Sequence, residues 1–205
     1  ILPQNASTVG LIDLKIISNK QSEYEFFDRL EKNQFKFLYL LGSDNLEIKK
    51  NKEFIVYQGS HGDRGAEIAD VVLPSATYTE QNGLYENLEG RVQECKKASY
   101  PIGEAKEDWK IFNMIIKKLD KNEAQLKFEL LREEVLNSLE NFSSLNELPK
   151  FSKKALREEK ADFFNETVEI KELNYYHSNS ISRASKTMNE CQQIRQKNTK
   201  TGTNN

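Results

Sequence analysis

The glycines and the histidine at residues 59–65 form the pattern in this chain that most suggests chemistry. Gly59, Gly62 and Gly65 follow a strand-like segment and precede a helix-like one, with His61 between them. Backbone N–H groups at a helix start favour an anion, so the spacing is compatible with a phosphate-binding loop. It is not the Gly-x-Gly-x-x-Gly fingerprint, and no acidic residue ends a following strand where it would hold a ribose. We therefore favour a tight turn and keep phosphate binding as the alternative.

His61 and nearby carboxylates are the candidates for proton transfer. A histidine titrates near neutral pH, and two carboxylates can divide the roles of acid and base. The carboxylates downstream are Glu80, Glu86 and Glu89. The sequence gives His61 no partner in register and places no two of these glutamates across a pocket. We favour structural roles for all four, and we expect Asp63 and Arg64 to pair locally or to cap a helix.

The two cysteines, Cys95 and Cys191, lie far apart, with no Cys-x-x-Cys pair and no histidine at ligand spacing. The sequence therefore predicts no zinc or iron–sulfur site in this chain. Free thiols are favoured over a disulfide. We assign no catalytic, cofactor-binding or metal-binding residue, and the alternative of a nucleotide near Gly62 and Gly65 stays open.

The elements that would position these residues alternate between strands and short helices. A capping box of Ser22 and Glu25 predicts a helix near the start of the chain. Further along we expect strands at 35–41, 53–59 and 71–74, a short helix at 64–70, and an extended segment at 85–93 in which Gly90 marks a bulge or a close backbone approach. Strands alternating with helices favour a parallel, Rossmann-like sheet of βαβ units, so the front half is predicted to be α/β.

Apolar residues at spacings of three and four predict two amphipathic helices in the back half. The first face carries Ala105, Trp109, Phe112, Ile116 and Leu119. The second follows a capping box of Asn122 and Gln125 and carries Ala124, Phe128, Leu131, Val135 and Leu139. We expect these helices to pack on the sheet or on each other, and the charged stretch 142–172 to lie on the surface.

The tail carries a third helical pattern. Its apolar stripe is Ile181, Ala184, Met188 and Cys191, and its opposite side carries Arg183, Lys186, Gln193 and Lys197. A short helix with so thin a stripe is marginal in water, so it should dock either on its own α/β domain or in a groove formed with a neighbouring subunit. Residues 198–205 have no apolar anchor and are expected to be loose.

Composition narrows the class of protein. The chain has 205 residues, enough for one domain with a tail, and its hydrophobic share of 37% is low for a globular domain. A net charge of -2 gives no indication of nucleic-acid binding. The longest apolar run, 37–41, is far shorter than the ~20 residues of a membrane-spanning helix.

Two sequence blocks carry a resemblance to a known family. "IADVVLPSATYTEQNGLYENLEGRVQ" at 68–93 resembles a signature of the molybdopterin oxidoreductases: Ala-Asp-x-x-Leu-Pro, a Thr-Glu pair, then Asn-x-Glu-Gly-Arg. The flanking "YQGSHGDRGAE" and "EDWKIF" are similar to the branch formed by the large iron–sulfur subunit of NADH:quinone oxidoreductase, respiratory complex I. The tail "YYHSNSISRASKTMNEC" at 175–191 resembles the mitochondrial form of that branch.

The resemblance implies an α/β fold, namely part of a molybdopterin oxidoreductase-like domain with a parallel sheet, followed by helices and an extended tail. The expected boundaries are 1–121 for this domain, 122–172 for a helical and charged surface segment, and 173–205 for the tail with a docking helix. Because the chain starts at Ile1 and lacks the family's cysteine-rich region, it is expected to be a fragment or the C-terminal part of the large iron–sulfur subunit.

The resemblance also implies a function without a cofactor in this chain. In the complex I branch the fold is kept and the pterin cofactor is not, so a scaffold role on the matrix side of the mitochondrial inner membrane is expected. Iron–sulfur clusters would lie in the N-terminal part and in partner subunits of the peripheral arm, with no nucleic-acid partner and no membrane span. The alternatives are a fragment of an active molybdopterin enzyme and a nucleotide-binding module.

Overall fold

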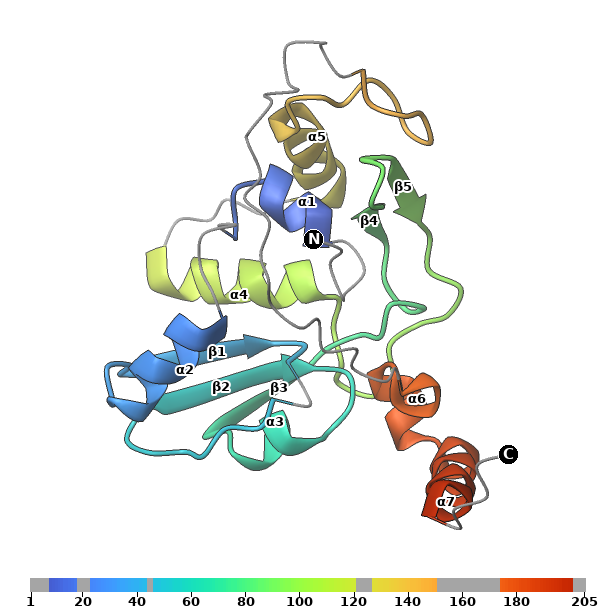
Figure 1. The fold of residues 1–205 in the computed structure, drawn as a ribbon. Coiled ribbons are helices and arrows are strands. Elements are labelled where there is room, and N and C mark those ends of the chain that lie inside the picture. Colours follow the sequence, from blue (N-terminus) through green and yellow to red (C-terminus); the bar gives the residue numbers. More distant parts are fainter. Residues whose placement is uncertain (1–7, 18–22, 44–45, 121–126, 151–173, 201–205) are drawn as a thin grey trace, which may run out of the picture.

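A three-stranded parallel sheet lies at the centre of the front half of the chain (Figure 1). The computed structural model describes residues 8–17, 23–43, 46–120, 127–150 and 174–200. The strands are β1 (Phe37–Leu41), β2 (Phe54–Gly59) and β3 (Val71–Pro74), with β2 in the middle. The register pairs Leu40 with Tyr57 and Tyr57 with Val72. The predicted α/β class and the predicted strands are confirmed, with β1 beginning two residues later than expected.

One face of the sheet packs against two helices, α2 (Glu23–Glu31) and α3 (Arg64–Glu67). The buried cluster on this face consists of Leu30, Leu38, Leu40, Ile55 and Tyr57, with Phe26, Ala66 and Ile68 packed around it. Alternate residues of β1 are buried because successive side chains of a strand point to opposite faces. The helix expected after Ser22 is confirmed, while Ser22 itself lies outside the described residues.

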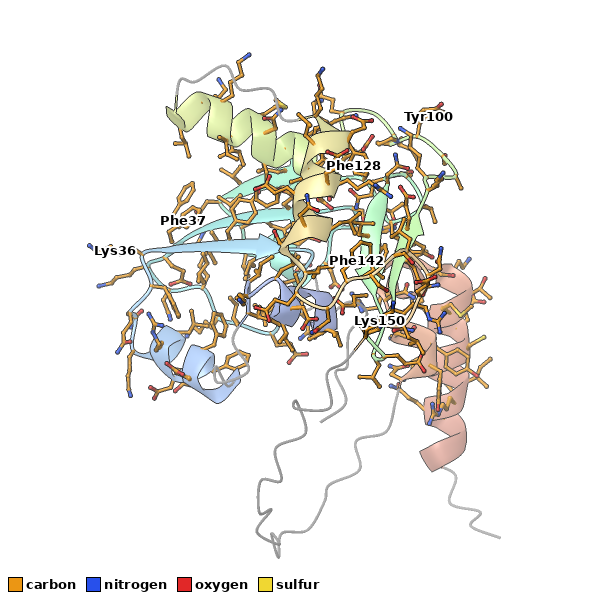
Figure 2. The ribbon with its side chains drawn as sticks, turned by 90° about the horizontal axis from the view of Figure 1, so that it is seen from above. Lys36, Phe37, Tyr100, Phe128, Phe142 and Lys150 are labelled. Carbon is orange, nitrogen blue, oxygen red and sulfur yellow. The ribbon has the colours of Figure 1, made fainter. Side chains whose placement is uncertain are left out.

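The opposite face of the sheet is covered by α4 (Asp108–Asp120), and α5 (Phe128–Ser138) packs on α4. The rings of Tyr39 and Phe112 lie 5.5 Å apart, and those of Trp109 and Phe128 lie 6.0 Å apart. Figure 2 shows Phe128 at the junction of the two helices. The predicted packing on the sheet and on each other is confirmed. The predicted cap at Asn122 and Gln125 lies outside the described residues.

The apolar face predicted for α4 is wrong at its C-terminal end. Ile116 and Leu119 are 48% and 80% exposed, whereas Ile111 is 7% exposed and faces the core. The predicted stripe therefore holds at Phe112, which packs on Tyr39 of the sheet, but not in the last turns of α4. Apolar side chains on several sides of α4 made the choice of face ambiguous in the sequence.

A hairpin replaces the extended segment predicted around Gly90. Its strands are β4 (Gly83–Glu86) and β5 (Val92–Cys95), paired antiparallel. The Asn87 side-chain oxygen accepts hydrogen bonds of 3.0 Å from the backbone N–H groups of Glu89 and Arg91, which closes the turn. Gly90 has φ of +79° and belongs to the turn, so the predicted bulge is wrong. The alternative of a close backbone approach is confirmed, because a Cβ on Gly90 would lie 2.8 Å from the ring of Pro149. Helix α1 (Thr8–Asp13) packs against β4.

The tail contains a 3-10 turn η2 (Tyr175–His177), α6 (Ser180–Ala184) and α7 (Lys186–Lys200), which contact one another. One continuous helix was predicted, but the chain breaks at Ser185, whose backbone is extended and whose hydroxyl accepts a 3.4 Å hydrogen bond from the N–H of Met188. Of the end predicted to be loose, residues 198–200 continue α7 and residues 201–205 lie outside the described part, so its looseness stays a prediction.

Three further predictions concern the domain boundaries, the two thiols and the absence of a membrane-spanning helix. The domain boundaries expected at 121 and 172 fall at segments outside the described residues and stay predictions. Cys95 and Cys191 are free thiols, both partly buried. Within the described part of the chain, no helix is long and apolar enough to cross a membrane.

Candidate functional site

The carboxyl edge of the parallel sheet is where a ligand would bind in an open α/β fold. Here that edge is formed by the ends of three strands: β1 leads into Gly42, β2 into the loop 60–63, and β3 into Ser75. The glycine-rich loop singled out in the sequence therefore occupies the expected position. What fills the loop decides whether it can cradle a ligand.

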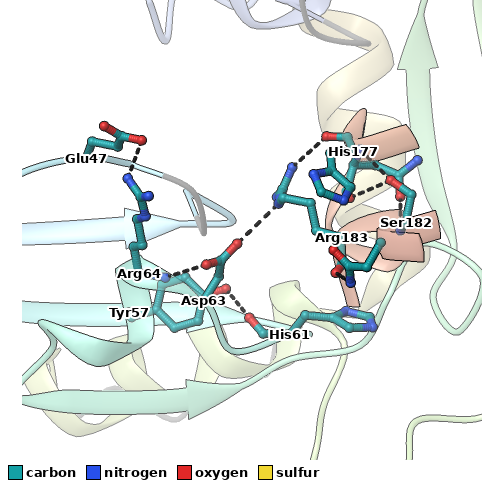
Figure 3. Close-up of polar contacts among 10 residues, drawn as sticks. Glu47, Tyr57, His61, Asp63, Arg64, His177, Ser182 and Arg183 are labelled. Atoms are coloured by element: carbon teal, nitrogen blue, oxygen red, sulfur yellow. Dashed lines mark hydrogen bonds and ion pairs between the residues drawn. The ribbon is translucent and has the colours of Figure 1, made fainter. Parts of the chain in front are cut away.

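The ring of Tyr57 fills the space beneath the glycines. Tyr57 is 1% exposed, and its hydroxyl donates a 2.6 Å hydrogen bond to the backbone oxygen of His61 (Figure 3). A Cβ on Gly59 would overlap the Tyr57 hydroxyl, and one on Gly65 would lie 2.5 Å from the backbone oxygen of Ser43 and 3.1 Å from the Tyr57 ring. A Cβ on Gly62 would meet only the Ala66 methyl, at 4.0 Å. Two of the three glycines thus allow close packing around a tyrosine, which supports the tight-turn interpretation.

A carboxylate already occupies the start of α3. Asp63 is the N-cap residue, and its side chain accepts a 2.9 Å hydrogen bond from the N–H of Arg64, so the predicted capping is confirmed. The second carboxylate oxygen of Asp63 lies 3.2 Å from Nε of Arg183, which arrives from α6 in the tail (Figure 3). Arg64 itself pairs with Glu47. A negative charge at this position disfavours a phosphate.

The contact with Asp63 corrects the prediction for the tail. Arg183 was placed on the solvent side of the tail helix, but its side chain is 19% exposed, bonded to Asp63 and to the backbone oxygen of His177 at 3.3 Å. The predicted apolar contact residues Ile181 and Met188 are instead 36% and 38% exposed. The tail therefore docks on its own α/β domain, and the ion pair between Arg183 and Asp63 is one of its contacts.

The structure does not bring the predicted proton-transfer residues together. Nδ1 of His61 lies 3.0 Å from Oγ of Ser60, Glu80 accepts a 3.2 Å hydrogen bond from the N–H of Thr77, and Glu89 is exposed near Arg91. Each of these contacts is local in the sequence. They support the structural roles favoured for these side chains.

Glu86 differs from the other glutamates because it lies in a pocket of about 290 Å³ between α1, the hairpin turn and the segment 139–149. Its residue exposure is 6%. Burial, and then the charge and hydrogen bond of Asp13, raise the pKa of Glu86 to about 7. Sequence reasoning sought its partner among nearby glutamates, but the partner is Asp13, more than seventy positions earlier in the chain.

Sequence reasoning missed a polar network on the α4 side of the carboxyl edge. Gln58, which is 0% exposed, donates a 2.6 Å hydrogen bond to Asp108 and accepts one from the hydroxyl of Tyr39. Gln81 donates to the other Asp108 oxygen at 2.9 Å and accepts from the Asp108 N–H at 3.0 Å. The available signal was a glutamine inside the apolar strand "FIVYQG", since a buried amide needs partners.

Comparison with known proteins agrees with the fold. Residues 1–118 match the family model described as molybdopterin oxidoreductase. An α/β domain with a parallel sheet and this match define the class: the chain belongs to the molybdopterin oxidoreductase family.

Three relatives carry more specific names. The chain is 41% identical to the NADH-ubiquinone oxidoreductase 75 kDa subunit of Reclinomonas americana over 200 residues, which cover 95% of this chain. It is 34% identical to a subunit of the NADH-quinone oxidoreductase of Rickettsia felis over 96% of this chain, and 36% identical to the mitochondrial NADH-ubiquinone oxidoreductase 78 kDa subunit of Candida albicans over 93%. The chain spans 28%, 28% and 27% of the lengths of these relatives.

The family name implies a pterin cofactor, and the residues at the glycine loop do not fit an anionic group of that kind. Tyr57 fills the loop, and Asp63 places a carboxylate at the helix start. Within the described residues, no group of three or more His, Cys, Asp or Glu side chains could hold a metal ion. We derive no chemical step through a cofactor at this edge.

Proposed function

We propose that this chain is a structural, non-catalytic portion of the large iron–sulfur subunit in the peripheral arm of respiratory complex I. In this role it supports electron transfer from NADH to ubiquinone on the matrix side of the mitochondrial inner membrane. The observation that carries the proposal is the match, over 93–96% of the chain, to the 75 and 78 kDa subunits of NADH-ubiquinone oxidoreductase and to their bacterial relative.

The site geometry supports a scaffold role. The carboxyl edge is closed by Tyr57, by the Gln58–Asp108–Gln81 network and by the ion pair to Arg183. A scaffold gains rigidity from such contacts, because buried polar groups that are satisfied hold their elements in one arrangement. In an enzyme, the carboxyl edge of the sheet would instead present free hydrogen-bond donors to a substrate.

The proposal assigns the redox cofactors to other parts of the assembly. Iron–sulfur clusters are held by cysteine thiolates, and this chain has only Cys95 and Cys191. The clusters would belong to the N-terminal part of the same subunit and to partner subunits, which are also the proposed binding partners of this chain.

Affinity purification tests the proposal. A tag on the chain, expressed in its own cells, should recover NADH:ubiquinone reductase activity and the iron of the complex, without stoichiometric molybdenum. Recovery of molybdenum with a different oxidoreductase activity would favour an active molybdopterin enzyme, and a tagged chain found apart from reductase activity would overturn the assignment to complex I.

Two substitutions test the proposal that this chain is non-catalytic. His61→Ala and Glu80→Gln should leave turnover per assembled complex unchanged, since within the described ranges the hydrogen bonds of both side chains are to residues local in the sequence. A large fall in turnover at unchanged iron content would show that this edge takes part in the reaction.

A further inference from the structure

An apolar groove lies between β3 and α4. Its volume is about 420 Å³. The apolar lining comes from Leu73, Pro74, Ile111, Met114 and Ile115. Met114 is 50% exposed at the mouth, whereas Ile111 is 7% exposed at the base.

The groove continues onto an outer strand of the sheet. β3 has a strand partner on one side only among the described residues, namely β2. On its other side, among the described residues, Lys106 pairs with the end of β3: its N–H donates to the backbone oxygen of Pro74, the last residue of the strand, and its own oxygen accepts from the N–H of Ala76. Val71 and Val72 are 39% and 49% exposed. An outer strand with exposed apolar side chains can pair with a further strand.

The charged side chains that line the groove indicate which kind of protein segment could bind there. Lys106 and Lys118 line it together with a single acidic residue, Glu104, and Lys117 adjoins Lys118 on the exposed end of α4. Two copies of this chain meeting through this face would oppose lysine to lysine, which disfavours self-association. An apolar segment that carries acidic side chains would satisfy both the groove and its lysines.

We propose that this groove and the outer edge of β3 bind an extended, acidic and apolar segment of a neighbouring protein in the assembly. The segment would pair with β3 through its backbone and place every second side chain in the groove, as in other cases of strand addition. The proposal rests on the proposed function for the identity of the assembly, whereas the groove itself is lined by residues of this chain.

Substitution at the groove mouth provides the first test. Met114→Glu in the tagged chain should lower the fraction recovered in the assembly about ten-fold, because a carboxylate at the groove mouth would replace an apolar contact and repel an acidic segment, which we expect to cost more than ~1.4 kcal/mol. Leu119→Glu is the matched control: this leucine is on the same helix and 80% exposed, but does not line the groove, so recovery should stay as in wild type. Equal recovery of Met114→Glu and wild type would overturn the proposal.

Photo-crosslinking provides the second test and does not depend on loss of assembly. A photoreactive phenylalanine analogue at position 114 should crosslink, in the intact assembly, to an acid-containing peptide of a different polypeptide; the same analogue at 119 should not. Crosslinks to a second copy of this chain, or none to protein, would overturn the proposal. If wild type fails to recover NADH:ubiquinone reductase activity, the proposed function fails, while the crosslink still reports on the groove.

Discussion

Replacing Glu86 by glutamine should stabilise the chain above neutral pH and change its stability little below pH 5. The pKa of Glu86 is raised from 4.5 to about 7, first by burial and then by the neighbouring Asp13. Between pH 4.5 and about pH 7, the Glu86 carboxyl group is deprotonated in the unfolded chain but still protonated in the folded chain. The wild-type free energy of unfolding therefore falls as pH rises through this range and levels off above pH 7.

The magnitude follows from the width of that range. Each pH unit is worth ~1.4 kcal/mol, so the range from 4.5 to about 7 sets a ceiling of about 3.5 kcal/mol. The pocket admits water, so we expect Glu86→Gln to gain about 1 to 3 kcal/mol at pH 8 relative to pH 5. Glutamine keeps the shape of the protonated side chain and can still donate to Asp13.

Urea unfolding between pH 5 and pH 8 measures the free energy of unfolding of each variant. It can be followed by the fluorescence of Trp109, because Trp109 is the single tryptophan. Glu89→Gln is the matched control: Glu89 lines the same pocket but is exposed, so its substitution should leave the pH dependence as in wild type. The reasoning would be refuted by a Glu86→Gln variant that is as pH-dependent as wild type, or less stable than it at pH 8.

Three other substitutions probe the turns and the tail. Gly90→Val should destabilise the chain by about 1 to 3 kcal/mol, because φ is +79° and a Cβ would lie 2.8 Å from the ring of Pro149; unchanged urea midpoints would contradict this. Gly65→Ala should lower the melting temperature and Gly62→Ala should not, since only the first adds a Cβ 2.5 Å from a backbone oxygen; equal effects would remove the packing argument. Arg183→Gln should speed hydrogen exchange at 181–194 by breaking the pair with Asp63, and exchange as slow as in wild type would show that other contacts hold the tail.

Local patterns predicted the elements of the front half well. β2 and β3 are short apolar runs that end at Gly59 and Pro74, and such residues interrupt strands for reasons that act within a few positions. The turn at Gly90 was misread because only the pairing of β4 with β5 distinguishes a hairpin from one extended run.

The candidate site depended on contacts that spacing does not encode. The packing role of Gly59 and Gly65 is visible only from the ring of Tyr57. This ring lies beneath the glycine loop and bonds the backbone oxygen of His61. The partner of Glu86 lies in α1, and the partner of Asp63 lies in the tail, 120 positions away. A sequence read in short windows shows which residues can ionise, but tertiary packing decides which of them meet.

The buried Tyr57 ring also sets the apparent affinity that any nucleotide could have at this edge. Opening the loop would expose an aromatic side chain, at about 2 to 3 kcal/mol, and break its hydrogen bond to the His61 carbonyl, at about 1 kcal/mol. The open conformer would then make up about 1% of molecules or less, and a ligand that selects it would have its apparent Kd raised about a hundred-fold or more. A substitution that removes the ring would therefore show whether this edge of the sheet can hold a nucleotide at all.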